Sequence, residues 1–117
     1  MAEITRGLGD DRVTPVRAAH VEHYVRDLRR RNLSPATIGH YRNGLERFER
    51  QAGISLLEAT TDDLADFIVE QSMSDATRYT YIAHLRAFYG WAKDEGHITA
   101  DPAAGLSYVL RQRRSNG

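Results

Sequence analysis

The chain has 117 residues, of which 41% are hydrophobic, and this is enough for one modest domain with a packed core. It contains no cysteine, which excludes disulfide bonds and thiolate metal sites, and no apolar run long enough to span a membrane. The formal net charge is zero, which taken alone argues against a nucleic-acid partner.

The charge is distributed unevenly along the chain. Residues 12–50 hold nine arginines against four acidic residues, whereas residues 51–75 hold six acidic residues and no basic one. Residues 76–117 hold six basic and three acidic residues. All but one of the basic residues are arginine, whose planar guanidinium binds phosphate with two hydrogen bonds. Blocks of this size also arise by chance, so the pattern indicates a phosphate-binding region without establishing one.

The first predicted helix follows a segment, residues 1–13, that has no hydrophobic periodicity and that we expect to be flexible. The helix begins at Thr14 and Pro15, a capping residue followed by a first-turn proline. It ends near Arg29–Arg31, because basic side chains favour the negative end of the helix dipole. Its apolar stripe consists of Val21, Tyr24, Val25 and Leu28.

The second predicted helix begins at Ser34 and Pro35 and ends near Gly53, a residue type that suits the position after a helix end. One side carries an apolar stripe of Ile38, Tyr41, Leu45 and Phe48. The opposite side carries small, amide, imidazole and guanidinium groups, whereas ordinary surface helices favour Glu and Lys. This side consists of Thr37, Gly39, His40, Asn43 and Arg47.

The third predicted helix follows Thr60 and Thr61, has two acidic residues in its first turn, and buries Leu64, Phe67 and Ile68. The fourth is capped by Ser74 and ends at Gly96. Its apolar side is Ile82, Leu85, Tyr89 and Ala92, flanked by Tyr81 and Phe88.

The segment after the fourth helix is predicted to be an extended exit in which Pro102 prevents further helix. Residues 107–117 form either a linker or a short fifth helix, and no strand is predicted anywhere. The predicted core consists of Val25, Leu28, Tyr41, Leu45, Phe48, Phe67, Ile82, Leu85 and Phe88.

The polar side of the second helix has chemistry suited to duplex DNA. Asn43 can pair with adenine through two hydrogen bonds in a major groove, and Arg47 can bind a phosphate. Thr37 and His40 can donate to bases or phosphates, and Gly39 allows close approach of the backbone. The alternative is a polar side that is simply solvated.

The second and fourth helices begin alike, because "SPATIGHY" and "SDATRYTY" each place a cap, then Ala-Thr, then a tyrosine. Helix N-termini present free N–H groups that suit phosphates. Residues toward the exposed side of the fourth helix are therefore further DNA-contact candidates, although small residues there also suit another helix. The candidates are Thr77, Arg78, Thr80 and His84.

Several of these patterns occur together in one known family. It has a Thr-x-x-x-Tyr-x-x-x-Leu-x-x-Phe helix, matched by Thr37, Tyr41, Leu45 and Phe48. It has a second threonine-opened helix with an aromatic pair, matched by Thr77, Leu85, Phe88 and Tyr89. It closes with Gly-x-Ile and Asn-Pro, matched by Gly96, Ile98 and Asp101-Pro102, with Asp in place of Asn. Over residues 16–106 the chain therefore resembles the core-binding, SAM-like N-terminal domain of tyrosine recombinases, the phage integrase family.

The resemblance implies an all-α, SAM-like, four- to five-helix orthogonal bundle over residues 14–106. It implies that the second and fourth helices approach the major groove in one half of a DNA clamp. Thr80 stands where the family commonly has an arginine, which puts an arginine contact there in doubt. Residues 107–117 would be a basic linker toward a catalytic domain absent from this chain, with phosphate contacts from Arg111, Arg113 and Arg114.

The resulting hypothesis is a DNA-binding module, without catalytic residues, cofactor or metal, of a site-specific recombinase. His20 and His23 alone do not make a metal site, since no other ligands cluster with them. We expect duplex DNA as the partner, a cytoplasmic, nucleoid-associated location, a monomeric isolated domain and a parent that assembles as a tetramer on DNA. The alternatives are a SAM-type protein-interaction module and a stand-alone helix-turn-helix regulator.

Overall fold

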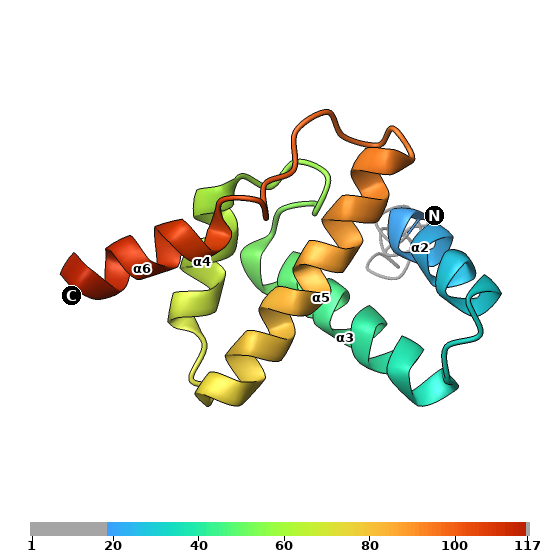
Figure 1. Ribbon diagram of the computed structural model, residues 1–117, viewed down its shortest axis with the longest axis horizontal. Coiled ribbons are helices and arrows are strands. Elements are labelled where there is room, and N and C mark those ends of the chain that lie inside the picture. The colour runs from blue at the N-terminus through green and yellow to red at the C-terminus, as the bar shows by residue number, and fades with distance from the viewer. Residues whose placement is uncertain (1–18, 117) are drawn as a thin grey trace, which may run out of the picture. The chain divides into compact units, whose positions relative to one another are not determined.

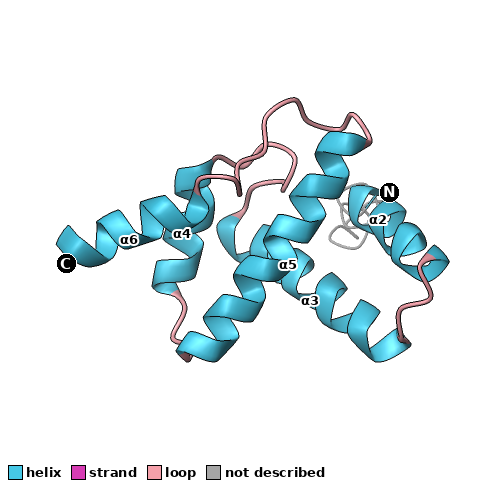
Figure 2. Cartoon of the chain, in the orientation of Figure 1, coloured by secondary structure: helices cyan, strands magenta, loops and turns pink. Residues whose placement is uncertain are grey.

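The structure is a computed structural model that describes residues 19–116, apart from the side chains of residues 114–116. Five helices and no strand are present in this part of the chain. Figure 2 shows the helices in cyan and the loops that join them in pink. The described residues divide into two compact units, residues 19–42 and 43–116. The predictions for residues 1–13 and for a helix start at Thr14–Pro15 lie outside the described residues.

The first unit contains helix α2 (Ala19–Arg30) and the beginning of α3 (Pro35–Ala52). The predicted stripe of α2 is buried throughout: Val21, Tyr24, Val25 and Leu28. The rings of Tyr24 and Tyr41 are stacked, with centroids 6.2 Å apart, although Tyr41 itself is only half-buried. Burial of Tyr24 raises the pKa of its hydroxyl, because the phenolate is disfavoured away from water.

Helix α2 ends in a Schellman motif. The Leu33 N–H donates to the Leu28 carbonyl at 3.4 Å, and the Asn32 N–H donates to the Arg29 carbonyl at 3.0 Å. Asn32, the first residue after the end of the helix, has φ of 65°, a left-handed conformation that asparagine tolerates better than most residues. Helix α5 (Asp75–Asp94) ends in the same way, with Gly96 at φ of 84°. The predicted end of α5 at Gly96 is therefore confirmed.

The second unit contains the rest of α3, helix α4 (Thr61–Glu70), α5, and helix α6 (Leu106–Asn116) (Figure 1). Its core includes an aromatic cluster in which Phe67 contacts Phe48 and Tyr81, with centroids 5.2 and 5.3 Å apart. The other buried side chains include Leu45, Leu64, Ile68, Leu85, Phe88 and Tyr89. These residues confirm the predicted stripes of α3 and α4 in this unit.

The predicted stripe of α5 needs a correction. Ile82 is only half-buried, whereas Tyr81 is buried with 8% of its surface exposed. The other three residues of the predicted stripe are fully buried, so the correction concerns only its first position, where Tyr81 replaces Ile82. Trp91, which was not assigned to the core, is also buried.

The loop between α3 and α4 is anchored through one residue. Leu56 is fully buried, its N–H donates to a Glu49 carboxylate oxygen at 2.8 Å, and its carbonyl accepts from the Tyr89 hydroxyl at 2.7 Å. Glu49 is itself 5% exposed. Both backbone groups of a buried loop residue are thus satisfied by side chains.

The sequence left open whether residues 107–117 form a linker or a short fifth helix. The structure shows a helix, α6, over residues 106–116. α6 packs beside α4, and its first residue, Leu106, is fully buried. Pro102 lies in the turn before it and accepts a hydrogen bond from the Thr61 hydroxyl at 2.6 Å. The predicted domain boundary after residue 106 thus falls in the first turn of α6.

Candidate nucleic-acid interface

Helices α3 and α5 begin with the same side-chain cap. The Ser34 Oγ accepts from the Thr37 N–H at 3.1 Å and donates to the Thr37 Oγ1 at 2.9 Å. The Ser74 Oγ makes the same two bonds with Thr77, at 3.2 and 3.0 Å. The similar N-terminal sequences of α3 and α5 therefore form the same capping arrangement. Each fixes a threonine hydroxyl beside the free N–H groups of a helix N-terminus.

The predicted polar side of α3 is exposed along most of its length. His40, Asn43 and Arg47 are exposed, whereas Thr37 is half-buried by its cap. Arg50 continues the same stripe three residues beyond Arg47 and was not predicted. Its helical spacing from Arg47 was the signal in the sequence that identifies it.

The two arginines of α3 differ in their contacts. Arg47 donates to the Gln71 side-chain oxygen at 2.9 Å, a neutral partner that leaves its charge uncompensated. Arg50 has no hydrogen bond or ion pair with any of residues 19–113. We call Arg47 and Arg50 the α3 arginine pair. Both guanidinium groups are available to an anion.

Tyr81 joins α5 to α3 directly beneath this pair. Its hydroxyl donates to the carbonyl of Gly44, which lies about one helical turn before Arg47 and about two before Arg50. A Cβ at Gly44 would lie 3.7 Å from the Tyr81 ring, so the two helices are in close contact here. Burial raises the pKa of Tyr81, and the nearby positive charges of Arg47 and Arg50 oppose this increase. The tyrosine therefore positions the part of α3 that carries the α3 arginine pair relative to α5.

The predicted residues of α5 do not all lie together. Thr77 and Thr80 are exposed, and the Thr80 hydroxyl donates to the Ala76 carbonyl at 3.1 Å. His84 is half-buried. Arg78 is also half-buried, forms an ion pair with Asp75 at 3.6 Å, and lines a pocket with residues of α4 and α6. Arg78 thus faces the pocket beside α4 and α6, and its charge is paired within α5.

The predicted basic residues of α6 are in different environments. Arg111 is exposed, and the side chain of Arg114 lies outside the described residues. Arg113 forms ion pairs with Asp62, at 3.2 Å, and with Asp66 on α4. The hydrogen bond that Arg113 donates to Asp66 raises the pKa of the Arg113 guanidinium. Its charge is therefore already compensated within the chain.

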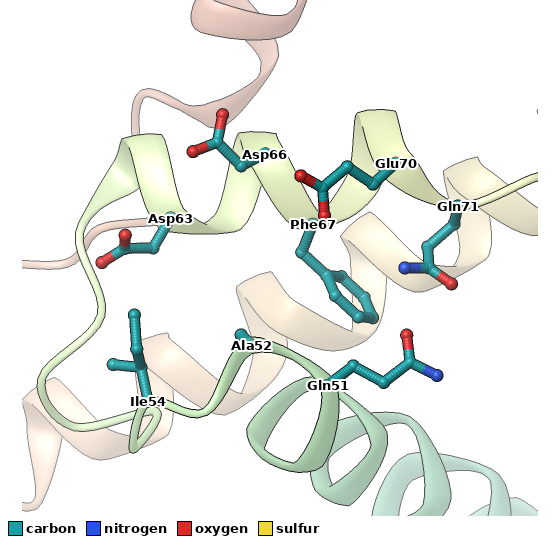
Figure 3. A pocket seen from close by; sticks show the side chains of 8 residues that line it. All are labelled: Gln51, Ala52, Ile54, Asp63, Asp66, Phe67, Glu70 and Gln71. Atoms are coloured by element: carbon teal, nitrogen blue, oxygen red, sulfur yellow. The ribbon is translucent and has the colours of Figure 1, made fainter.

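A pocket in the second unit has an acidic lining that does not suit phosphate. It measures about 320 Å³ and lies between the end of α3 and α4, as Figure 3 shows. Its lining includes Asp63, Asp66 and Glu70. Asp63 is also part of the α4 capping box, in which it accepts from the Thr60 N–H at 2.9 Å. The negative charges of residues 51–75 are thus concentrated on and around α4.

Two classes of site have no candidates in the part of the chain that the structure describes. No group of three or more His, Cys, Asp or Glu side chains there could hold a metal ion. No helix within residues 19–116 is long and apolar enough to cross a membrane.

The helices and their order define an all-α, SAM-like domain. Residues 21–96 match the family described as "Phage integrase, N-terminal SAM-like domain". Tyrosine recombinase XerC of Oceanobacillus iheyensis is 34% identical over 83 residues, which are 65% of this chain and 27% of that protein. The chain therefore belongs to the phage integrase family and contains its N-terminal SAM-like domain.

A solved structure supports the same fold. The integrase from mycobacterium phage Brujita matches with a TM-score of 0.71 and 22% identity, over 74% of this chain and 30% of that one. The chain thus matches less than a third of the length of each of these two relatives. At this identity the structural match establishes the fold, which confirms the predicted class.

Proposed function

We propose that this chain is the part of a site-specific tyrosine recombinase that binds duplex DNA at the recombination core site. The observation that carries the proposal is the exposed side of α3, where Asn43 lies beside two uncompensated guanidinium groups. A planar amide can identify adenine, and guanidinium groups can bind the phosphates on either side. The family of the chain supports DNA as the partner.

The roles proposed for the individual residues follow from their positions. Asn43 contacts a base edge, whereas Arg47 and Arg50 contact phosphates and fix the orientation of α3. His40 contacts a base or a phosphate from the same side. Thr37 and Thr77 lie at the capped N-termini of α3 and α5, where phosphate oxygens are favoured. Thr80 and His84 extend the contact along α5.

The remaining activity belongs to the parent protein in this proposal. A catalytic domain outside these 117 residues would cleave and join strands, and the parent would assemble as a tetramer on DNA. The chain alone should leave the topology of supercoiled and nicked plasmid unchanged. Reproducible relaxation by rigorously purified protein would contradict this division of labour.

The test is fluorescence anisotropy with the core site of the parent element and a scrambled duplex, at several salt concentrations. The wild-type chain should bind weakly, near about 10⁻⁴–10⁻⁶ M at physiological salt, and more weakly as salt rises. Asn43→Ala should reduce discrimination between the duplexes by about 1–3 kcal/mol and leave the salt dependence unchanged. Arg47→Ala should weaken binding to both duplexes and flatten the salt dependence by about one unit.

The matched control is Lys93→Ala, which removes one positive charge at the opposite end of α5 from Thr77. Lys93 is exposed, so this variant should fold normally and bind as the wild type does. If Asn43→Ala and Arg47→Ala also bind like the wild type, α3 does not contact DNA. Salt-tolerant self-association without DNA binding would instead support a protein-interaction module.

A further inference from the structure

The end of α6 is held on α4 by an arginine between two carboxylates. Asp62 and Asp66 are one helical turn apart on α4, and both form ion pairs with the Arg113 guanidinium. The carboxylates are largely exposed, with 76% and 58% of their side-chain surface accessible, and Arg113 has 32%. We call this group of three residues the α4–α6 clamp. It uses the same guanidinium donors that would bind a phosphate.

The beginning of α6 is held by different contacts. Leu106 is fully buried, and the Ser107 hydroxyl accepts a hydrogen bond from Arg86 on α5. Between the two ends, Leu110 and Arg113 line a pocket of about 200 Å³ with Ile68, Val69 and Arg78. α6 is thus fixed by burial where it begins, but mainly by exposed charge where it ends.

Because the charged end of α6 is exposed, the carboxylates that bind Arg113 in the α4–α6 clamp can be replaced by another anion. Ion pairs in water are individually weak, and another anion can replace either carboxylate without exposing a buried charge. A DNA phosphate offers an anionic group of similar geometry and belongs to a far more highly charged polymer. The burial of Leu106 would keep the beginning of α6 in place while its charged end is released.

We propose that Asp62 and Asp66 hold Arg113 away from DNA in the unbound chain, and that phosphates displace these carboxylates when DNA binds. The clamp is then a latch that lowers the affinity for DNA until the duplex is close enough to compete. This inference rests on the proposed function, because it assumes that the chain binds DNA. It adds a regulatory role for the acidic face of α4.

The experiment compares the wild-type 117-residue chain with a set of variants on one duplex at 0.15 M salt. Asp62→Asn with Asp66→Asn should increase affinity by about three- to tenfold, because two exposed ion pairs no longer hold Arg113. The control removes two exposed acids that do not contact Arg113, by Glu58→Gln with Glu70→Gln. It reports the general effect of removing two negative charges, which we expect to be smaller.

The decisive comparison repeats the Asp62→Asn, Asp66→Asn substitution in the presence of Arg113→Ala. Without Arg113 there is nothing to release, so the gain should fall to that of the control. Asp66→Asn alone, which leaves the first turn of α4 intact, should give an intermediate gain. An equal gain with and without Arg113 would overturn the latch and show a general charge effect.

A second measurement needs no DNA. Hydrogen exchange of the backbone amides at the end of α6 should be faster in the Asp62→Asn, Asp66→Asn variant than in the wild type and in the control. Unchanged exchange would mean that the carboxylates do not hold α6, and it would overturn the inference. If the wild type binds no duplex, the proposed function fails and the latch fails with it; if only the gain is missing, the latch alone fails.

Discussion

Two pairs of arginines in residues 43–116 have the same formal charge and opposite surroundings. Arg47 and Arg50 lie exposed on α3 without an acidic partner among the described residues. Arg78 and Arg113 line one pocket beside α4, and each forms an ion pair with an aspartate. The number of arginines in a segment therefore does not measure the charge that it offers to DNA. The position of the acidic residues in the folded chain decides that quantity.

The largest expected effect is on the free energy of unfolding, and it separates the core of α3 from the α3 arginine pair. We expect the core residue Leu45 to be needed for stability and the arginine pair not to be. Leu45 is buried on the opposite side of α3, with 1% of its surface exposed, so Leu45→Ala should lower the free energy of unfolding by about 2–5 kcal/mol. Arg47→Ala with Arg50→Ala should change it by less than about 0.5 kcal/mol per site. Urea denaturation followed by circular dichroism measures both. Comparable losses would mean that the pair has a structural role.

The next effect compares the two arginine pairs directly. Arg47→Ala with Arg50→Ala should lower DNA affinity about tenfold and flatten the dependence of log Kd on log salt by about two units, one per lost phosphate contact. Arg78→Ala with Arg113→Ala should flatten it by about one unit at most, because Arg78 lies in the pocket. Anisotropy titrations between 50 and 200 mM salt distinguish the pairs. Equal slopes for the two double variants would remove the distinction.

A smaller effect concerns the hydroxyl beneath the α3 arginine pair. Tyr81→Phe removes the hydrogen bond to the Gly44 carbonyl and should lower the free energy of unfolding by about 0.5–1.5 kcal/mol. The salt dependence of DNA binding should stay the same, because no phosphate contact is lost. Tyr79→Phe is the matched control, since Tyr79 is 74% exposed on the same helix. A loss equal to that of the control would mean that the bond contributes nothing.

Alkaline pH gives an independent check on the same tyrosine. Burial raises the pKa of Tyr81 above its ordinary value of 10.0, whereas the unfolded chain loses this proton near that value. The stabilising contribution is therefore present below pH 10 and is lost as pH rises through the raised pKa. Tyr81→Phe should lose less stability than the wild type between pH 9 and pH 11. An identical pH dependence would contradict the effect of burial.

The smallest expected effect tests whether α3 meets a partner. A Cβ at Gly39 would find no heavy atom within 4 Å, so Gly39→Ala should stabilise the helix by about 0.5–1 kcal/mol. If DNA approaches the backbone there, the same variant should bind DNA less tightly. Thermal unfolding and anisotropy measure the two changes. A gain in stability without any change in affinity would remove Gly39 from the proposed contact.

Local signals in the sequence predicted the helices well. Ser34 and Ser74 cap helices where their residue types and the following residues indicated, and Gly53 and Gly96 end helices with positive φ. The α3 stripe was predicted because its spacing is regular over about three turns, although Tyr41 is only half-buried. The α5 stripe was predicted except at its first position, because Tyr81 and Ile82 are both apolar and periodicity alone does not distinguish them.

Features that join distant segments were not visible in the sequence. Glu49 was assigned no role, because nothing in its neighbourhood indicates that Leu56 would need a buried acceptor. Arg113 forms ion pairs with Asp66 and Asp62 on α4, which precede it in the sequence by 47 and 51 positions. Only the fold brings these residues together. The sequence therefore identified side chains that could contact DNA, but it did not indicate which of them are free of other contacts within the chain. Their availability depends on these tertiary contacts.

The anchoring of Leu56 has a consequence for the order of folding. Its bond to Glu49 closes 7 residues of chain, whereas its bond to Tyr89 closes 33. Closing the longer segment costs about 1.4 kcal/mol more in chain entropy at equal stiffness. We therefore expect the end of α3 and the following loop to associate before α5 joins them. Substitutions at Glu49 should then mainly slow folding, whereas loss of the Tyr89 hydroxyl should mainly accelerate unfolding.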